Sequence, residues 1–159
     1  GKKWKAMKDL SIIIPNWNTK ELLKDCLNSI YKETGKISFE IIIIDNGSTD
    51  GSSELIKKEF AFITLIENKK NFGFTKACNE GISISNGKYI LLLNTDTIIL
   101  ENALDKLIDF ADKHKSGGIF GPKLININGS IQPSFSHFPR SILSNKRKNQ
   151  NYKHIYNVP

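Results

Sequence analysis

The stretch Lys88-Tyr-Ile-Leu-Leu-Leu-Asn-Thr-Asp-Thr97 decides the fold of this chain. Its apolar run, from Tyr89 to Leu93, stops abruptly at Asn94-Thr95-Asp96. An apolar run between a glycine and polar residues predicts a central β-strand that is buried on both faces. Ligands of open α/β sheets bind beyond the carboxyl ends of the strands. We therefore expect Asp96 to lie where a metal ion or a phosphate-bearing ligand would bind.

Strands and helices are predicted to alternate on both sides of this stretch. Earlier apolar runs predict strands at residues 10–15, 39–45 and 62–67, and helical patterns are expected at 18–31, 52–60, 75–85 and 101–114. In the first helix, Asn18 and Glu21 form a predicted capping box. Its buried face is expected to hold Leu22, Leu23, Cys26, Leu27, Ile30 and Tyr31. This order predicts an α/β fold of three layers, α/β/α, with a mostly parallel central sheet.

The remainder of the chain divides by composition. Residues 118–125 predict a fifth strand, and Asn128-Gly129 predicts a hairpin turn that leads to Ile131-Gln132. Beyond Pro133 the sequence becomes polar and basic. We expect a basic extension at residues 1–9, one α/β domain at 10–135 and a basic tail at 136–159.

Length and composition are those of an ordinary soluble domain. The chain has 159 residues, of which 39% are hydrophobic and 25% are charged. It contains no apolar run long enough to span a membrane, and its start lacks the pattern of a secretory signal. Cys26 and Cys78 fall on apolar helix faces, which predicts reduced core thiols and a cytoplasmic protein.

The net charge of +7 is concentrated near the C-terminus. Residues 113–159 contain eight lysine and arginine residues and no aspartate or glutamate. A solvated basic tail is the simplest interpretation. The functional alternative is attraction to an anionic ligand or peripheral contact with an anionic membrane surface, at the inner face of the membrane. Nucleic-acid binding is not expected, because no recognition motif accompanies the charge.

Polar clusters follow three of the predicted strands. They are Pro15-Asn-Trp-Asn18, Asp45-Asn-Gly-Ser48 and Asn94-Thr-Asp96. A parallel sheet brings these ends to one edge, so Asp45 and Asp96 are expected to face one crevice. Either aspartate alone is explained as a turn former or a helix cap. Together, at two strand ends, they favour a binding site.

Several ligand classes are excluded by their motifs. The first strand is not followed by G-x-G-x-x-G, so a dinucleotide-binding fold is poorly supported. The motif G-x-x-x-x-G-K-[ST] does not occur, which excludes a P-loop nucleotide-binding site. The stretch around Asn94 resembles the haloacid-dehalogenase phosphatase motif, but an amide at this position cannot form an aspartyl-phosphate. A sugar-1-phosphate nucleotidyltransferase would need a glycine-rich loop where Pro15–Asn18 stands.

Four motifs occur in one order along the chain. They are Ile13-Ile-Pro-Asn-Trp-Asn18, Ile43-Ile-Asp-Asn-Gly-Ser-Thr-Asp-Gly-Ser52, Asn71-Phe-Gly-Phe-Thr-Lys-Ala-Cys-Asn-Glu-Gly-Ile82 and Leu92-Leu-Asn-Thr-Asp-Thr97. Together, over roughly residues 10–135, they resemble the nucleotide-sugar domain of inverting family 2 glycosyltransferases, which has the A-type fold. Gly121-Pro-Lys-Leu124 and Asn128-Gly-Ser-Ile-Gln132 resemble the rhamnosyltransferase-like branch. Compared with that family, the domain is expected to be truncated.

The resemblance implies where the nucleoside would bind. Pro15 and Asn16 would line the nucleobase pocket, and Asp45 would hold the base or the ribose. Ser48 and Asp50 are expected to shape the loop rather than to bind.

The third motif implies a segment that passes over the nucleotide. Asn71 and Phe72 would belong to it, and Gly73 would allow close backbone approach. Lys76 would meet the diphosphate, with a solvated lysine as the alternative, and Asn79 would support the loop from its helix.

The fourth motif implies a metal site. Asn94, Thr95 and Asp96 occupy the D-x-D position of the family, where Asp96 would bind Mg²⁺ or Mn²⁺ that bridges the two phosphates. One carboxylate suffices when phosphates supply the other ligands. The metal would neutralise charge on the departing nucleoside diphosphate. Because Asn94 replaces an acidic residue, metal affinity is expected to be modest without the donor.

Inversion also requires a general base, which the family draws from a downstream acidic segment. The last acidic residue here is Asp112, and His137 and His154 are lone histidines in polar stretches, so the general base stays unassigned. Two hypotheses therefore remain. One is the donor-binding part of a glycosyltransferase that is inactive alone, and the other is a non-catalytic nucleotide-sugar-binding module.

The resemblance also implies partners. The expected donor is dTDP-rhamnose, with a UDP-sugar as the alternative, and the expected acceptor is a glycan or a lipid-linked glycan. An incomplete domain would expose apolar surface, so self-association into a homo-oligomer is expected.

Overall fold

The computed structural model describes residues 7–132. They form β1 (Lys8–Asn16), α1 (Lys20–Glu33), β2 (Phe39–Asp45), α2 (Ser52–Glu59), β3 (Thr64–Glu67), α3 (Phe74–Ile84), β4 (Gly87–Leu92), α4 (Ala103–Lys113), β5 (Leu124–Ile125) and β6 (Ile131–Gln132). The chain divides into two compact units, the first ending at Ile108 and the second beginning at Asp109. The basic tail, His137 and His154 lie outside the described residues, as does most of the N-terminal extension.

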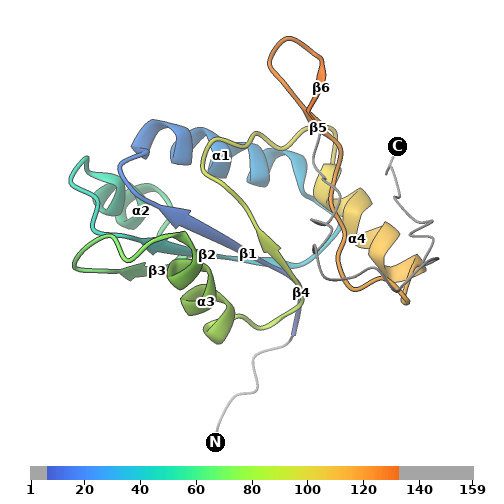
Figure 1. Ribbon diagram of the computed structural model, residues 1–159, viewed down its shortest axis with the longest axis horizontal. Coiled ribbons are helices and arrows are strands. Elements are labelled where there is room, and N and C mark those ends of the chain that lie inside the picture. The colour runs from blue at the N-terminus through green and yellow to red at the C-terminus, as the bar shows by residue number, and fades with distance from the viewer. Residues whose placement is uncertain (1–6, 133–159) are drawn as a thin grey trace, which may run out of the picture. The chain divides into compact units, whose positions relative to one another are not determined.

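The first unit is built on a parallel sheet with the strand order β3-β2-β1-β4 (Figure 1). All three strand pairings are parallel, and β1 sets Asn16 beside Asp45 of β2 and Ile13 beside Leu92 of β4. The prediction of a parallel central sheet is confirmed. Because the strands run in the same direction, the polar residues that follow β1, β2 and β4 all lie at the edge of the sheet formed by the carboxyl ends of the strands.

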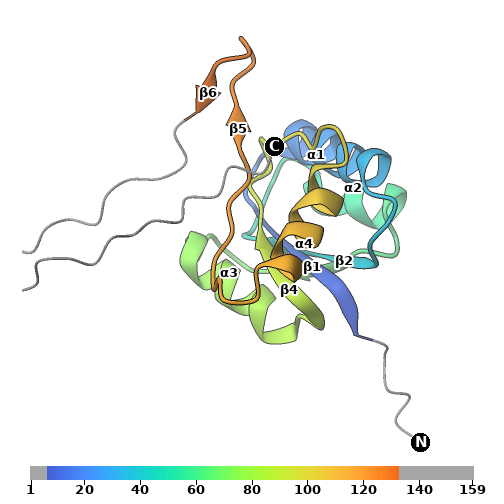
Figure 2. The same cartoon turned by 90° about the vertical axis from the view of Figure 1, so that its right-hand side faces the viewer.

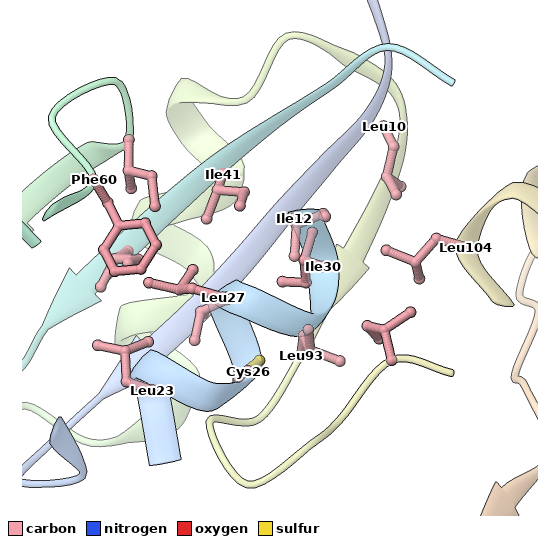
Figure 3. Packing of buried hydrophobic residues seen from close by; sticks show 14 of the residues in the cluster. Leu10, Ile12, Leu23, Cys26, Leu27, Ile30, Ile41, Phe60, Leu93 and Leu104 are labelled. Carbon is pink, nitrogen blue, oxygen red and sulfur yellow. The ribbon is translucent and has the colours of Figure 1, made fainter. Parts of the chain in front are cut away.

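Helices cover both faces of this sheet, with α1 and α2 on one face and α3 on the other (Figures 1 and 2). Side chains of β2 alternate between the two layers. Ile41 and Ile43 pack in the cluster that contains α1 and α2, which Figure 3 shows, whereas Ile42 and Ile44 pack with Ala77 of α3. Burial on both faces explains the continuous apolar runs Ile12–Ile14 in β1 and Ile41–Ile44 in β2.

The position of β4 differs from the prediction. Its apolar run was expected to form a central strand buried on both faces, but within the described sheet β4 is an edge strand that pairs with β1. Its Ile90 and Leu92 side chains are exposed, while Tyr89 and Leu91 pack against the core on the opposite face. An apolar run shows that a strand can be buried, but it does not show what covers it.

Two details of α1 also differ from the prediction. The helix begins at Lys20 after the N-cap residue Thr19, so the Asn18–Glu21 capping box is wrong. The buried face includes Leu23, Cys26, Leu27 and Ile30 as predicted, but Leu22 and Tyr31 are exposed. Among residues 7–132, no helix combines the length and the hydropathy needed to cross a membrane.

The second unit contains a short antiparallel hairpin of β5 and β6. The predicted Asn128-Gly129 turn is confirmed: Gly129 has a φ of +80°, and the Asn128 side-chain oxygen accepts a hydrogen bond from the Ser130 N–H at 3.0 Å. The predicted fifth strand at residues 118–125 is too long, because only Leu124–Ile125 is paired. Its pairing is with β6 and not with the parallel sheet.

Candidate functional site

The end of β2 is fixed by the carboxylate of Asp45, which is only 2% exposed. Its Oδ1 accepts a hydrogen bond from Asn16 Nδ2 at 2.7 Å, and its Oδ2 accepts one from the Ser48 backbone N–H at 2.9 Å. Asn16 is equally buried at the end of β1. The two strand ends are therefore joined through side chains as well as through the sheet.

Thr19 extends this contact to the end of β4. Its hydroxyl donates to Asn16 Oδ1 at 2.7 Å, and its oxygen lies 2.9 Å from the hydroxyl oxygen of Thr95. The result is one chain of side chains from Asp45 through Asn16 and Thr19 to Thr95. The three polar strand ends meet at one edge of the sheet, as the sequence predicted.

The loop after β4 is also held by α1. The Cys26 thiol donates to the Asn94 carbonyl oxygen, with the two atoms 3.9 Å apart, and Ser29 Oγ accepts from the Ile99 N–H at 2.9 Å. Within this loop Thr95 is buried, while Asn94 and Asp96 are exposed. The middle residue anchors the loop, and the residues on either side of it are left open to solvent.

The thiol of Cys26 responds to the charge on this loop. Burial raises its pKa to about 12, and the nearby Asp96 carboxylate contributes in the same direction. Both effects disfavour the thiolate. Cys26 is therefore a protonated hydrogen-bond donor at neutral pH. Cys26 and Cys78 are buried free cysteines, as predicted.

The loop after β2 is shaped by Ser48 and Asp50, as expected. Ser48 Oγ accepts from the Asn18 backbone N–H at 2.9 Å, and Asn18 Oδ1 accepts from the Thr49 N–H at 2.8 Å. This exchange explains the positive φ of Asn18, 52°. Asp50 Oδ2 accepts from the N–H of Lys20, the first residue of α1, at 2.8 Å.

Asp50 thus supplies the helix cap that the sequence analysis assigned to Asn18. Asp50 is exposed, and the limited desolvation of its carboxylate acts to raise the pKa, but hydrogen bonds from the Ser52 hydroxyl and from backbone N–H groups outweigh it. The net result is a pKa below the ordinary value. The cap is consequently a carboxylate at neutral pH, which suits the N-terminus of a helix.

The loop before α3 is open and basic. Asn71 Oδ1 accepts from the Gly73 N–H at 2.8 Å, and Gly73 has a φ of +88°, a conformation that favours glycine. Two ammonium groups lie near the exposed ring of Phe72, with Lys76 Nζ 3.6 Å and Lys70 Nζ 5.4 Å from the ring centroid. Two cations are therefore gathered around one exposed ring.

Polar residues beneath this loop were missed by the sequence analysis. Asn46 Nδ2 donates to the Gly73 carbonyl oxygen at 3.4 Å, and Asn68 Nδ2 donates to Asn46 Oδ1 at 3.2 Å and to Glu80 Oε2 at 3.0 Å. The support expected from Asn79 comes from its neighbour Glu80, while Asn79 is exposed. Asn46 and Glu80 both lie within the family motifs quoted above, and this position could have identified them as candidates for supporting the loop.

The described residues fit a metal ion only if a ligand brings most of the donor atoms. Within residues 7–132, no three His, Cys, Asp or Glu side chains are close enough to hold a metal. Of the two carboxylates at the strand ends, Asp96 is exposed, whereas Asp45 is buried and accepts hydrogen bonds from Asn16 and Ser48. A hard cation such as Mg²⁺ is commonly held by one or two carboxylates plus substrate phosphates, and this geometry is compatible with that arrangement.

The sequence of the chain is similar to those of known glycosyltransferases. The family model described as "Glycosyl transferase family 2" matches residues 11–158. The poly(ribitol-phosphate) beta-glucosyltransferase of Bacillus spizizenii is 36% identical over 129 residues, which are 78% of this chain and 20% of that protein. The poly(ribitol-phosphate) beta-N-acetylglucosaminyltransferase TarP of Staphylococcus aureus is 33% identical over 131 residues, 80% of this chain and 40% of that protein.

Solved structures resemble the chain over the same region. The crystal structure of S. aureus TarS 1-349 in complex with UDP-GlcNAc superposes with a TM-score of 0.69 and 26% sequence identity. The match covers 79% of this chain and 37% of that one. The chain thus spans less than half the length of the proteins that it matches here, and the predicted A-type fold is confirmed for the part that they share.

Proposed function

This chain belongs to glycosyl transferase family 2, and from that premise we propose that it binds the nucleoside diphosphate of a sugar donor at the ends of β1, β2 and β4. The proposal rests on the hydrogen-bonded chain that joins Asp45 to Thr95, the neighbour of Asp96. In this proposal, the strand end that binds the nucleoside and the loop that binds the metal lie at the same edge of the sheet. The enzyme that contains this domain would transfer the sugar to an acceptor with inversion.

We propose that the donor is a UDP-sugar. The relatives are named as a glucosyltransferase and an N-acetylglucosaminyltransferase, and TarS has been crystallised with UDP-GlcNAc and with UDP. These names support a UDP-sugar as the donor. The sequence motifs had instead favoured dTDP-rhamnose. The dTDP nucleotide remains the alternative to be measured.

In this proposal the two ends of the donor meet different residues. Pro15, Asn16 and Asp45 bind the nucleoside. Asp45 accepts a hydrogen bond from it through carboxylate lone pairs that are not already used by Asn16 and Ser48. The diphosphate lies toward the loops after β4 and before α3. Lys76 is suited to the diphosphate because its ammonium group is exposed on the Phe72 ring.

Asp96, with Asn94 and Thr95 beside it, would hold Mg²⁺ or Mn²⁺ together with the phosphates. The metal would neutralise the negative charge of the leaving nucleoside diphosphate. Asn94 is an amide and contributes no charge, so the site should bind the metal well only in the presence of the diphosphate. This makes metal and nucleotide binding mutually dependent.

The acceptor that we propose is a phosphate-rich glycan polymer. Two relatives are named for action on poly(ribitol-phosphate), and residues 113–159 of this chain contain eight basic and no acidic residues. Positive charge attracts polyanions and raises their rate of encounter. A non-catalytic nucleotide-sugar-binding module is the second candidate.

Calorimetric titration with UDP and dTDP, with and without Mn²⁺, tests the donor site. We expect UDP to bind, Mn²⁺ to strengthen the binding, and Asp96→Asn to abolish the metal effect. Glu59→Gln is the matched control, because Glu59 is an exposed carboxylate at the end of α2 that pairs with Lys24 at 2.9 Å and is not among the residues proposed to bind the donor. A folded chain that binds neither nucleotide would refute the donor site. Transfer of sugar to an added acceptor would separate the enzyme from the binding module.

A further inference from the structure

We infer that Thr19 is a positioning residue that sets the metal-binding loop against the nucleoside-binding end of the site. The inference rests on the proposed function and deepens it, because it names the residue through which the two ends of that site are held together. Thr19 lies outside the residues that the motifs indicate as ligand-binding. Its side chain contacts both Asn16 and Thr95.

The chain of hydrogen bonds has one direction. A threonine hydroxyl has a single proton, and the side-chain oxygen of Asn16 is purely an acceptor. Thr19 must therefore donate to Asn16 and accept from Thr95. Asn16 in turn donates through Nδ2 to Asp45. The direction of every hydrogen bond is thereby fixed: Thr95 donates to Thr19, Thr19 donates to Asn16, and Asn16 donates to the Asp45 carboxylate.

The place of Thr19 at the start of α1 makes this contact unusual. A threonine at the N-cap ordinarily accepts a hydrogen bond from an N–H of the first helical turn. Here the N-cap side chain makes no such bond, and Asp50 accepts from the Lys20 N–H instead. The hydroxyl of Thr19 is thus used for tertiary contact with two strand ends and not for starting the helix.

Loss of this hydroxyl should affect the two ends of the site unequally. Asn16 would keep its bonds to Asp45 at 2.7 Å and to Ser48 Oγ at 3.1 Å, so the nucleoside end stays in place. Thr95 would lose its contact with Thr19, next to the exposed Asp96. The expected defect is therefore in the metal-dependent part of nucleotide binding.

The test compares UDP affinity with and without Mn²⁺ in Thr19→Val, which keeps the shape and removes the hydroxyl. We expect the strengthening of UDP binding by Mn²⁺ to fall about tenfold, the size found when partners of metal ligands are removed. Affinity for UDP alone should stay within about twofold, and Thr19→Ser should restore the metal effect. The control is Thr34→Val, since the buried Thr34 hydroxyl oxygen has no hydrogen-bond partner in the described structure.

Thr95→Val provides a second route to the same contact if Thr19→Val folds poorly, as judged by its urea midpoint. It should show the same loss of the metal effect, and the double variant should lose no more of that effect than either single variant, because both substitutions remove the hydrogen bond between Thr19 and Thr95. Amide hydrogen exchange at Thr95 and Asp96 should become faster in each variant.

The outcomes separate the two proposals. If the unchanged protein binds no nucleotide, the proposed function fails and this inference fails with it. If it binds UDP with a metal effect and Thr19→Val retains that effect, only the role of Thr19 is refuted. If Thr19→Val weakens UDP binding equally with and without Mn²⁺, Thr19 serves general packing, and the inference is also overturned.

Discussion

The carboxylate of Asp105 offers a sharp test of how the first unit is held together. It lies in the first turn of α4, is 7% exposed, and accepts hydrogen bonds from three consecutive backbone N–H groups. The donors are Gly35, Lys36 and Ile37, at 3.1, 3.2 and 3.2 Å. They belong to the segment between α1 and β2. Asp105→Ala removes all three bonds at once.

The expected cost follows from these contacts. A hydrogen bond to a charged group contributes about 1.5–3 kcal/mol, and three of them set the upper bound. Gly35 and Lys36 are exposed, so water can replace the carboxylate for part of the loss. Alanine also gains a few tenths of a kcal/mol in helix propensity. We therefore expect Asp105→Ala to lower the free energy of unfolding by about 3 kcal/mol.

Urea unfolding followed by far-UV circular dichroism measures this loss. For a protein of this size it corresponds to a fall in the midpoint of about 1–2 M. Asp109→Ala is the control, because its carboxylate is exposed and forms one ion pair with Lys113 at 2.6 Å, of a kind that contributes about 0.3–0.5 kcal/mol. A loss below about 1 kcal/mol for Asp105→Ala would refute the argument.

Three further predictions concern other residues of the first unit. Gly81→Ala should destabilise the protein by about 1 kcal/mol or more, because the new Cβ would lie 2.5 Å from Ile13 Cγ2. Gly35→Ala, with open space around it, should not, and urea midpoints compare them. The pKa of Asp50 is lowered, so the stability that it adds is present above 3.8 and is lost as pH falls through its folded pKa. Asp50→Asn should therefore have a lower free energy of unfolding than the unchanged protein at pH 6, and the difference should disappear in acid. Cys26, with a pKa of about 12, should resist iodoacetamide at pH 8 until urea unfolds the chain; rapid labelling of the native protein would contradict its burial.

Much of the fold follows from local patterns. The residues predicted for β2, 39–45, are those observed, because its apolar run has clear polar limits on both sides. The meeting of three polar strand ends follows from parallel topology alone. The edge position of β4 could not be predicted, because it depends on which other segments pair with that strand.

The errors around α1 have one physical cause. Asn18 and Glu21 satisfy the local rule for a capping box, but Asn18 is used by Thr49 and the cap is supplied by Asp50. Thr19 was missed for the same reason, since its partners are three and 76 positions away and only the folded sheet brings them together. Local rules identify residues that can cap or bind, but tertiary contacts decide which of them do.

The most direct test of the central claim is to locate Mn²⁺ on the protein in the presence of UDP. Paramagnetic broadening of backbone amide signals reports distance from the ion. We expect broadening to be strongest at residues 94–97 and to extend to Thr19 and Lys76, and to require both UDP and Asp96. Broadening that is centred elsewhere, or that persists unchanged in Asp96→Asn, would contradict the assignment of these strand ends as the donor site.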